Sequence, residues 1–473
     1  MARMELRPRI GILQAEWPLQ SQTFNCVWML TEAGYQVDLF LYETPVYYDL
    51  DRLGTSSNLL VHTFPKSDRA ASYARRTWKA IKDRTEPWPT LRAALMSLVS
   101  IVHGGLKSVC ELSAIMQGRE EDLIPDRVLQ EAQALMTGKR YRCLIGIEKK
   151  GLIWAGIMGD RLGIPYIYYS LELYTWDHPE SRRSLHARRT KLVEEQYHKK
   201  SAATIIQDEE RAQILFRDNG VRPSRLFYVP VSLLGEPYRA RPPFLHKRLQ
   251  LPSDQRLILQ FGQICQERLS VELAHVAQDF PKDWSLVLHG YGPDSVIRRI
   301  AEIDVNGRLF LSLDMVPSSR ILELIASADI GLALYSSSPA NDLLTAFSSE
   351  KVALYLQSGV PLIAFDYPGY RRLMDRYRCG MVISTLGELP KAVERILSSY
   401  EEFRSNAYDC FIDCYDFAKH FKAVIEGISN LRSFSAGTPT AVNSSPSPMP
   451  SIQGWKTGFI ERCMRVCTTR KWH

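Results

Sequence analysis

Short apolar runs alternate with amphipathic stretches along most of the chain. The first run is residues 9–14 (RIGILQ), which precedes a helical pattern at 24–35 and a second apolar run at 37–42. Runs of this length joined by single helical stretches are typical of parallel strands with crossover helices. The same unit recurs at residues 142–173, and 203–207 adds a further strand. We therefore predict a first doubly wound α/β domain.

A second alternation begins after residues 235–252, a segment rich in Pro and Arg that predicts a linker. Strand patterns at 256–262, 284–292 and 329–335 are separated by helical patterns. We predict two facing Rossmann-like domains with a cleft between them, a disordered linker and a short tail. The predicted boundaries are 1–234, 235–252, 253–432, 433–453 and 454–473.

The last two segments lack a folding pattern. Residues 433–453 are rich in Ser, Pro and Thr and cannot bury enough apolar surface to fold. Residues 454–473 are basic and amphipathic, so two readings stay open: an interfacial membrane helix or docking peptide, and a disordered basic tail. The apolar stretch 91–116 is interrupted by charges and a Gly pair, which favours buried or interfacial helices over a bilayer span.

The net charge of the chain limits the classes of partner that we expect. Among 473 residues, 59 are Lys or Arg and 52 are Asp or Glu, a net charge of +7. This excess suits a polyphosphate ligand or an anionic membrane surface and is too small to indicate nucleic acid.

The nine cysteines include no C-x-x-C pair, and no His cluster lies near them. We therefore expect free thiols in a reducing cytosol and no metal. The N-terminus shows no signal-peptide pattern, and we expect a cytoplasmic protein.

Candidate chemistry follows the strands of the second domain, because ligands of doubly wound sheets bind beyond the carboxyl ends of the strands. Gly262 and Gln263 end one strand, and Arg268 lies close enough to reach a diphosphate. Another strand ends in a Gly-Tyr-Gly sequence that suits close approach to a nucleotide; these donor-site candidates are Gly290, Tyr291 and Gly292.

A third loop precedes an amphipathic helix. Ser348, Ser349 and Glu350 stand at its start, where serine caps and free amides favour an anion. Lys351 lies in the first turn, against the preference of the helix dipole, and a bound phosphate would explain it. The alternative is an ordinary Ser-capped helix with a solvated lysine.

Residues 348–365 (SSEKVALYLQSGVPLIAF) resemble the SSxKxxxYLxxGxPxI signature of GT-B glycosyltransferases in glycosyltransferase family 4. The order LILQFGQICQER, LVLHGYG, ADIGLALY and Asn341 agrees with that family, and the likeness covers roughly residues 8–430, with 45–140 matching only in outline. It implies a hexosyltransferase that uses a nucleoside-diphosphate sugar, retains the anomeric configuration and needs neither cofactor nor metal. Tyr335 and Asn341 then join the donor site.

The resemblance also exposes two departures. Family members neutralise the leaving diphosphate with a basic pair; Arg268 matches its second position, whereas Gln263 stands at the first, and Lys351 is the candidate replacement. Many members carry two glutamates eight positions apart, and here these positions hold Ala346 and Leu354. Asp342 and Glu350 have the same spacing one helical turn earlier.

The first domain offers a second set of candidates. Glu172, at a strand end, is a candidate catalytic residue beside Arg268 and Lys351, and Glu148, Lys149 and Gly151 form a candidate acceptor or sugar site. Each carboxylate has a plain alternative as a solvated loop charge.

Three readings of the function stay open. The first is sugar transfer from a nucleotide sugar to an acceptor. Three features favour a lipid-linked or polysaccharide glycan as that acceptor, with the tail at the inner face of a membrane: the basic segment 66–84, the apolar stretch after it and the tail. The second reading is a catalytically silent GT-B domain that acts as a binding or scaffolding protein, and the third is a nucleotide-sugar epimerase. A nicotinamide enzyme is disfavoured because no G-x-G-x-x-G follows the first strand.

Overall fold

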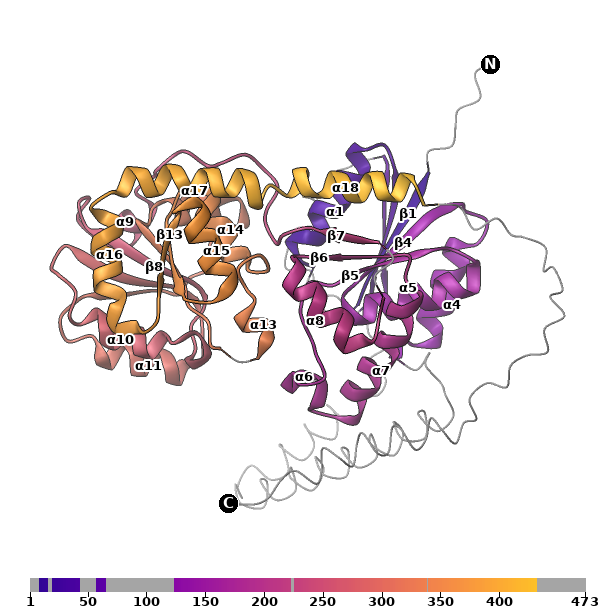
Figure 1. Cartoon of the computed structure of the whole chain (residues 1–473), viewed down its shortest axis with the longest axis horizontal. Helices are drawn as coiled ribbons and strands as arrows, with labels where there is room; N and C mark the ends of the chain where they lie inside the picture. Colours follow the sequence, from indigo (N-terminus) through magenta and orange to yellow (C-terminus); the bar gives the residue numbers. More distant parts are fainter. Residues whose placement is uncertain are drawn as a thin grey trace, which may run out of the picture. The chain divides into compact units, whose positions relative to one another are not determined.

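The computed structural model describes residues 8–15, 19–42, 57–64, 123–222, 225–337 and 339–431. One compact unit, Met1–Ser67 with Asp126–Leu431, carries every element named below (Figure 1). The predicted linker 433–453, the tail 454–473 and the apolar stretch 91–116 lie outside the described residues.

Seven parallel strands form the first sheet, in the order β3-β2-β1-β4-β5-β6-β7. Near-continuous apolar runs suit strands covered on both faces by helices. The strands are β1 Arg9–Ala15, β2 Gln36–Tyr42, β3 Leu59–Phe64, β4 Tyr141–Ile147, β5 Tyr166–Tyr169, β6 Ala203–Ile206 and β7 Leu226–Tyr228, and the helices are α1 Ser21–Glu32, α4 Asp126–Met136, α5 Glu148–Leu162, α6 Pro179–Arg182, α7 Leu185–Lys200 and α8 Glu209–Asn219.

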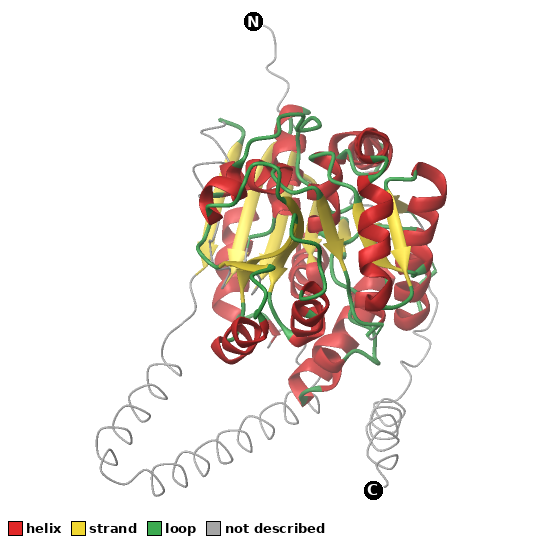
Figure 2. Cartoon of the chain, turned by 90° about the vertical axis from the view of Figure 1, so that its left-hand side faces the viewer, coloured by secondary structure: helices red, strands yellow, loops and turns green. Residues whose placement is uncertain are grey.

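Six parallel strands form the second sheet, in the order β10-β9-β8-β11-β12-β13, with helices packed around them (Figure 2). Its strands are β8 Arg256–Gln263, β9 Trp284–Tyr291, β10 Leu309–Ser312, β11 Ile330–Ala333, β12 Leu362–Phe365 and β13 Gly380–Ile383. Its helices are α9 Phe244–Leu249, α10 Ser270–Ala277, α11 Asp294–Ile303, α12 Ile321–Ala326, α13 Ala340–Leu343, α14 Glu350–Gln357, α15 Pro368–Tyr377, α16 Leu389–Leu397 and α17 Tyr400–Cys414, with 3-10 turns η3 Gln266–Arg268, η4 Ser318–Arg320 and η5 Leu386–Glu388. The predicted pair of parallel-sheet α/β domains is thereby confirmed.

The last described helix, α18 (Phe417–Ser429), leaves the second sheet and joins the core of the first. It contacts α1 and β7, and its buried side chains belong to a core cluster that also includes residues of β1 and β2; they are Phe417, Phe421, Val424 and Ile428. Figure 1 shows α17 and α18 as consecutive helices at the yellow end of the chain. The sequence pattern grouped this segment with the second domain, because chain order does not reveal which core a terminal amphipathic helix covers.

Both sheets reverse their strand order near the middle, at β1/β4 in the first and at β8/β11 in the second. Such a switch point separates loops that turn to opposite sides, and it leaves a crevice beyond the carboxyl ends of the strands. Most of the predicted site residues follow β4, β8 and β11, so the topology places them at the two switch points. Among the described residues, no helix is both long enough and apolar enough to cross a membrane.

Candidate functional site

Two glycines bring the ends of β8 and β9 close together at the second switch point. Gly262 and Gly290 are paired in register, with φ of 109° and 146°, a region that favours glycine. A Cβ on Gly290 would lie 1.8 Å from the Gly262 carbonyl oxygen, and one on Gly292 would lie 2.1 Å from that of Ile264. These glycines are thus explained by strand packing, whereas Gln263 and Tyr291 are exposed beside them, Tyr291 to 72%.

Two cations lie on the ring of Tyr335, just beyond β11. The Arg268 guanidinium is 4.7 Å from the ring centroid and the Lys351 Nζ is 5.0 Å away. Arg268 also pairs with Asp342 at 3.1 Å, and the charge of Asp342 raises the pKa of Arg268 against the opposing effect of burial. The structure therefore brings together two predicted catalytic residues, Arg268 and Lys351, that are far apart in sequence.

Lys351 lies in an environment that disfavours its charge. Burial, and secondly the nearby charge of Arg268, lower the pKa of its ammonium group to about 7. A Cβ built on Gly262 would lie 3.8 Å from Nζ, so the amino group faces the glycine turn at the end of β8. A diphosphate at this position would add negative charge beside the Lys351 amino group, whereas Arg268 already pairs with Asp342.

The loop before α14 forms hydrogen bonds with residues from both sheets' sides of the unit. Ser349 shares a hydrogen bond with the Tyr335 hydroxyl, and Ser348 Oγ accepts from Arg211 at 2.9 Å. Glu350 accepts from Ser21, and burial raises the pKa of its carboxyl. These three predicted donor residues accordingly have protein partners. The α14 N-cap residue Ser349 makes no side-chain capping bond, unlike the predicted Ser cap.

The two positions where many family members carry glutamate are apolar core here. Ala346 and Leu354 are 4% and 1% exposed and belong to one core cluster under α14. Asp342 and Glu350 do not take their place as a pair, because Asp342 binds Arg268 whereas Glu350 binds Ser21.

Glu148 and Glu172 form the acidic side of the site. Both backbone N–H groups of Leu171 and Glu172 donate to Glu148 Oε1 at 2.8 Å, while its buried Oε2 has no hydrogen-bond partner. Burial, and then the charge of Glu172, raise the pKa of Glu148 to about 8. Glu148 also adopts φ of 61°, uncommon for a side-chain-bearing residue. Glu172 Oε2 accepts from Asn341 Nδ2 at 2.8 Å.

Lys149 contacts an aromatic ring, whereas Gly151 allows a helix to pack closely on a strand. Lys149 Nζ lies 3.8 Å from the centre of the Tyr174 ring, and burial lowers the pKa of its ammonium group. Gly151 packs α5 against β1, since a Cβ there would lie 2.5 Å from the Leu13 carbonyl oxygen. Gly151 is thus required by the helix–strand contact.

Sequence reasoning missed Arg211, which connects the acidic side to the α14 loop. Arg211 is fully buried in the first turn of α8, and its guanidinium donates to Leu171 O, Asn341 Oδ1 and Ser348 Oγ at 2.9–3.1 Å. The available signal was a basic residue in the first turn of a helix that follows a strand, the same signal that singled out Lys351.

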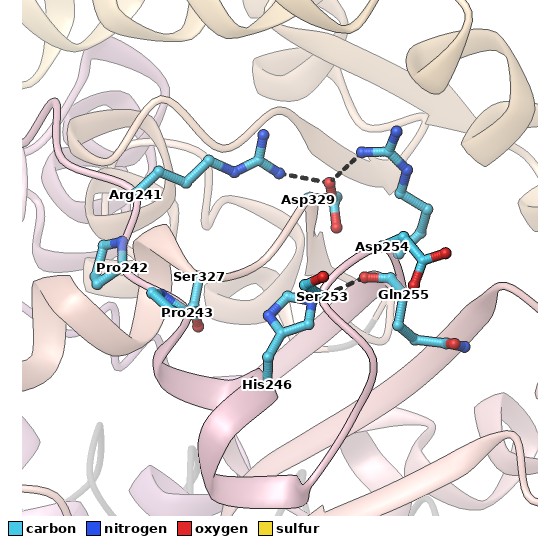
Figure 3. A pocket seen from close by; sticks show the side chains of 10 residues that line it. Arg241, Pro242, Pro243, His246, Ser253, Asp254, Gln255, Ser327 and Asp329 are labelled. Atoms are coloured by element: carbon cyan, nitrogen blue, oxygen red, sulfur yellow. Dashed lines mark hydrogen bonds and ion pairs between the residues drawn. The ribbon is translucent and has the colours of Figure 1, made fainter.

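A separate cavity of about 280 Å³ lies at the amino ends of the second sheet's strands (Figure 3). Arg241 and Arg256 both bind Asp329 there, and Asp329 also accepts from the Leu257 N–H at 2.8 Å. This arrangement fastens the predicted linker 235–252 to the second sheet, at the opposite edge from the candidate site. No group of three metal-binding side chains occurs among the described residues, and metal independence stays a prediction.

Among known proteins, only solved structures are found to be similar to this chain. No protein-family model and no curated protein matches the chain. HepE from Anabaena, in complex with UDP and glucose, is similar over 90% of this chain and 100% of its own, with a TM-score of 0.59 and 13% identity. Sucrose-phosphate synthase from Thermosynechococcus elongatus is similar over 89% and 99%, with a TM-score of 0.55 and 12% identity.

WaaG, a glycosyltransferase involved in lipopolysaccharide biosynthesis, is similar over 89% of this chain and 100% of its own, with a TM-score of 0.55 and 13% identity. Identities this low establish the fold and leave the activity open. Membership of glycosyltransferase family 4 stays a prediction. From the two parallel sheets and these likenesses we conclude that the chain has the GT-B fold of such glycosyltransferases.

Proposed function

We propose that the protein transfers a sugar from a nucleoside-diphosphate sugar to an acceptor hydroxyl. The observation that carries this proposal is the pair of cations, Arg268 and Lys351, on the Tyr335 ring at the switch point of the second sheet. A leaving diphosphate is stabilised by positive charge held in place before the reaction. Arg268 and Lys351 are the groups that supply it, and Glu172, which accepts from Asn341, is the candidate partner of the sugar.

We propose uridine diphosphate sugars as the donor class. HepE structures hold UDP or UDP-glucose, and they are among the solved structures similar to this chain. We further propose a retaining, metal-independent reaction with no cofactor, as the family resemblance implies. For the acceptor we propose a lipid-linked or polysaccharide glycan, on the basis of the basic segment 66–84 and the amphipathic tail.

Calorimetric titration of the full chain with UDP, GDP and their glucose conjugates tests the proposal. We expect binding of the uridine series, and at least tenfold weaker binding by Arg268→Ala and by Lys351→Ala, as a lost charge-assisted contact of about 1.5–3 kcal/mol requires. Lys391→Ala, on the exposed side of α16, is the matched control and should bind normally. If none of the four ligands binds the wild-type chain, the transferase proposal is wrong.

A second candidate is a silent GT-B protein that serves as a scaffold. The specific observation in its favour is the apolar core at Ala346 and Leu354, where many family members carry glutamates. A chain that binds UDP-glucose yet neither hydrolyses nor transfers glucose to lipid-linked glycans would favour this candidate.

A further inference from the structure

Three cysteines gather beneath the helix that carries Lys351. Cys379 and Cys410 are buried in the same core cluster as Leu354 and Tyr355 of α14, and Cys414 is partly exposed at the end of α17. Cys410 and Cys414 are one helical turn apart, so their side chains project from the same face of α17. Cys379 Sγ contacts the Met374 sulfur at 3.9 Å, and its hydrogen bond with Cys410 is the main reason why the pKa of the Cys410 thiol is raised.

Cys414 has the surroundings of a reactive thiol. Its Sγ donates to the Tyr377 hydroxyl at 3.3 Å, and that hydroxyl donates to Asp413 Oδ2 at 3.2 Å. The hydrogen bond from Cys410 is the main reason why the pKa of Cys414 falls to about 7; Tyr377 and the charge of Arg376 act in the same direction, against burial and Asp413. A partly exposed thiol of this kind is about half ionised at neutral pH, and the thiolate is the nucleophile.

We propose that Cys414 and Cys410 form an oxidisable thiol pair, in which Cys414 reacts with hydrogen peroxide and Cys410 closes a disulfide. The Cys414 thiolate attacks one peroxide oxygen, forms an S–O bond and breaks the O–O bond; the departing hydroxide takes up a proton and becomes water. Cys410 then loses its proton and attacks the Cys414 sulfur, which forms the S–S bond and releases the second oxygen as water. The two thiols lose two electrons and two protons in total, and the peroxide gains them.

Closing this disulfide must distort the last turn of α17. Residues four apart in a helix have Cβ atoms about 5–6 Å apart, whereas a disulfide holds them at about 3.5–4.5 Å. Cys414 is the final residue of α17, where a helix yields most easily. The next residue, Tyr415, donates to the Ala346 carbonyl and stacks on Phe347 at 5.6 Å, so the distortion reaches the loop before α14. An effect on donor binding through that loop rests on the proposed function.

Peptide mass spectrometry of the full chain tests the pair without reference to any donor. After peroxide treatment, thiol alkylation and trypsin digestion, residues 405–419 form one peptide with both cysteines, and Cys379 lies in peptide 379–391. We expect the 405–419 peptide to become lighter by two hydrogen atoms and to escape alkylation. A cross-link to peptide 379–391, or full alkylation of both cysteines, would overturn the proposal.

Two variants distinguish the cysteine that reacts with peroxide from the cysteine that closes the disulfide. Cys410→Ala should leave Cys414 as a sulfenic acid that dimedone traps, while Cys414→Ser should leave Cys410 reduced; Cys143→Ala, a buried cysteine of β4, should behave as wild type. Because Cys414 is partly exposed, Cys414→Ser keeps the test valid if Cys410→Ala fails to fold. Oxidation should also speed hydrogen exchange in residues 341–349 and weaken UDP binding about fivefold, as expected for one lost hydrogen bond. Disulfide formation with unchanged exchange there would refute the link to the loop.

Discussion

Lys351 shows how neighbours alter the chemistry of a single residue. The sequence placed it in the first turn of a helix, where its charge is disfavoured, and the structure adds burial and the charge of Arg268. An amine whose pKa is about 7 is only half protonated at neutral pH. A bound diphosphate stabilises the ammonium form and raises that pKa, so ligand binding and proton uptake are coupled.

This coupling predicts the pH dependence of nucleotide binding. Above pH 7 the free protein has lost a proton that the complex retains, so UDP affinity should fall as pH rises, by up to about tenfold per pH unit. Calorimetry at pH 8 in two buffers of different ionisation enthalpy should report uptake approaching one proton. Lys351→Met should abolish the uptake; equal uptake in the variant would assign the proton to another group.

Glu148 gives a linkage of the same sign, here between pH and folding stability. Its pKa is raised from 4.5 to about 8 in the folded state, so the folded chain binds more protons than the unfolded chain between these values. The contribution of Glu148 to stability is therefore fully present below about pH 4.5 and is lost as pH rises toward 8.

We expect Glu148→Gln to remove this contribution, since the amide oxygen still accepts from Leu171 and Glu172 but carries no charge. The melting temperature of the variant should fall less between pH 6 and pH 8.5 than that of the wild type. Identical shifts in both proteins would show that Glu148 is already ionised at pH 6.

At the scale of elements, the sheets were predictable and the contacts between elements were not. Apolar runs and Gly-ended helices identify strands such as β8 and β9 and the helix α14, because both signals are local in sequence. Arg211 and Asp342 were missed as partners because their contacts span 40–137 and 74 positions, respectively, and no local pattern records such a pairing. The sequence also did not reveal that Gly151 is required by packing; its contact with a ligand stays a prediction.

The contact of α5 with β1 makes a quantitative prediction. Gly151→Ala places a methyl group 2.5 Å from the Leu13 carbonyl oxygen, so it should lower the free energy of unfolding by about 1–3 kcal/mol, the usual cost of overpacking. Gly387→Ala, where the nearest atom is 3.8 Å away, should change it by less than about 0.5 kcal/mol. Urea denaturation followed by circular dichroism measures both, and equal midpoints would contradict the packing role.

At the scale of the whole chain, α18 ties residues near the end of the described chain to the first sheet. Phe421 is fully buried in that core, whereas Lys422, the next residue of the helix, is exposed. Phe421→Ala should therefore destabilise the first core by about 3–5 kcal/mol and Lys422→Ala hardly at all.

Hydrogen exchange can locate that loss. In Phe421→Ala, the amides of β1 and β2 should exchange faster, while those of β8 and β9 keep their wild-type rates. Faster exchange confined to the second sheet would show that α18 supports that sheet instead.

The position of α18 also sets an order of events during synthesis. The last strand of the first sheet ends at Tyr228, but the helix that covers its core comes roughly 200 residues later, or about 10–40 s at ordinary rates of translation. During this interval the second sheet can emerge and fold, while the first keeps an uncovered apolar face in the nascent chain. The part made first is thus completed last, and we expect its apolar face to be the surface of the nascent chain most open to chaperone binding.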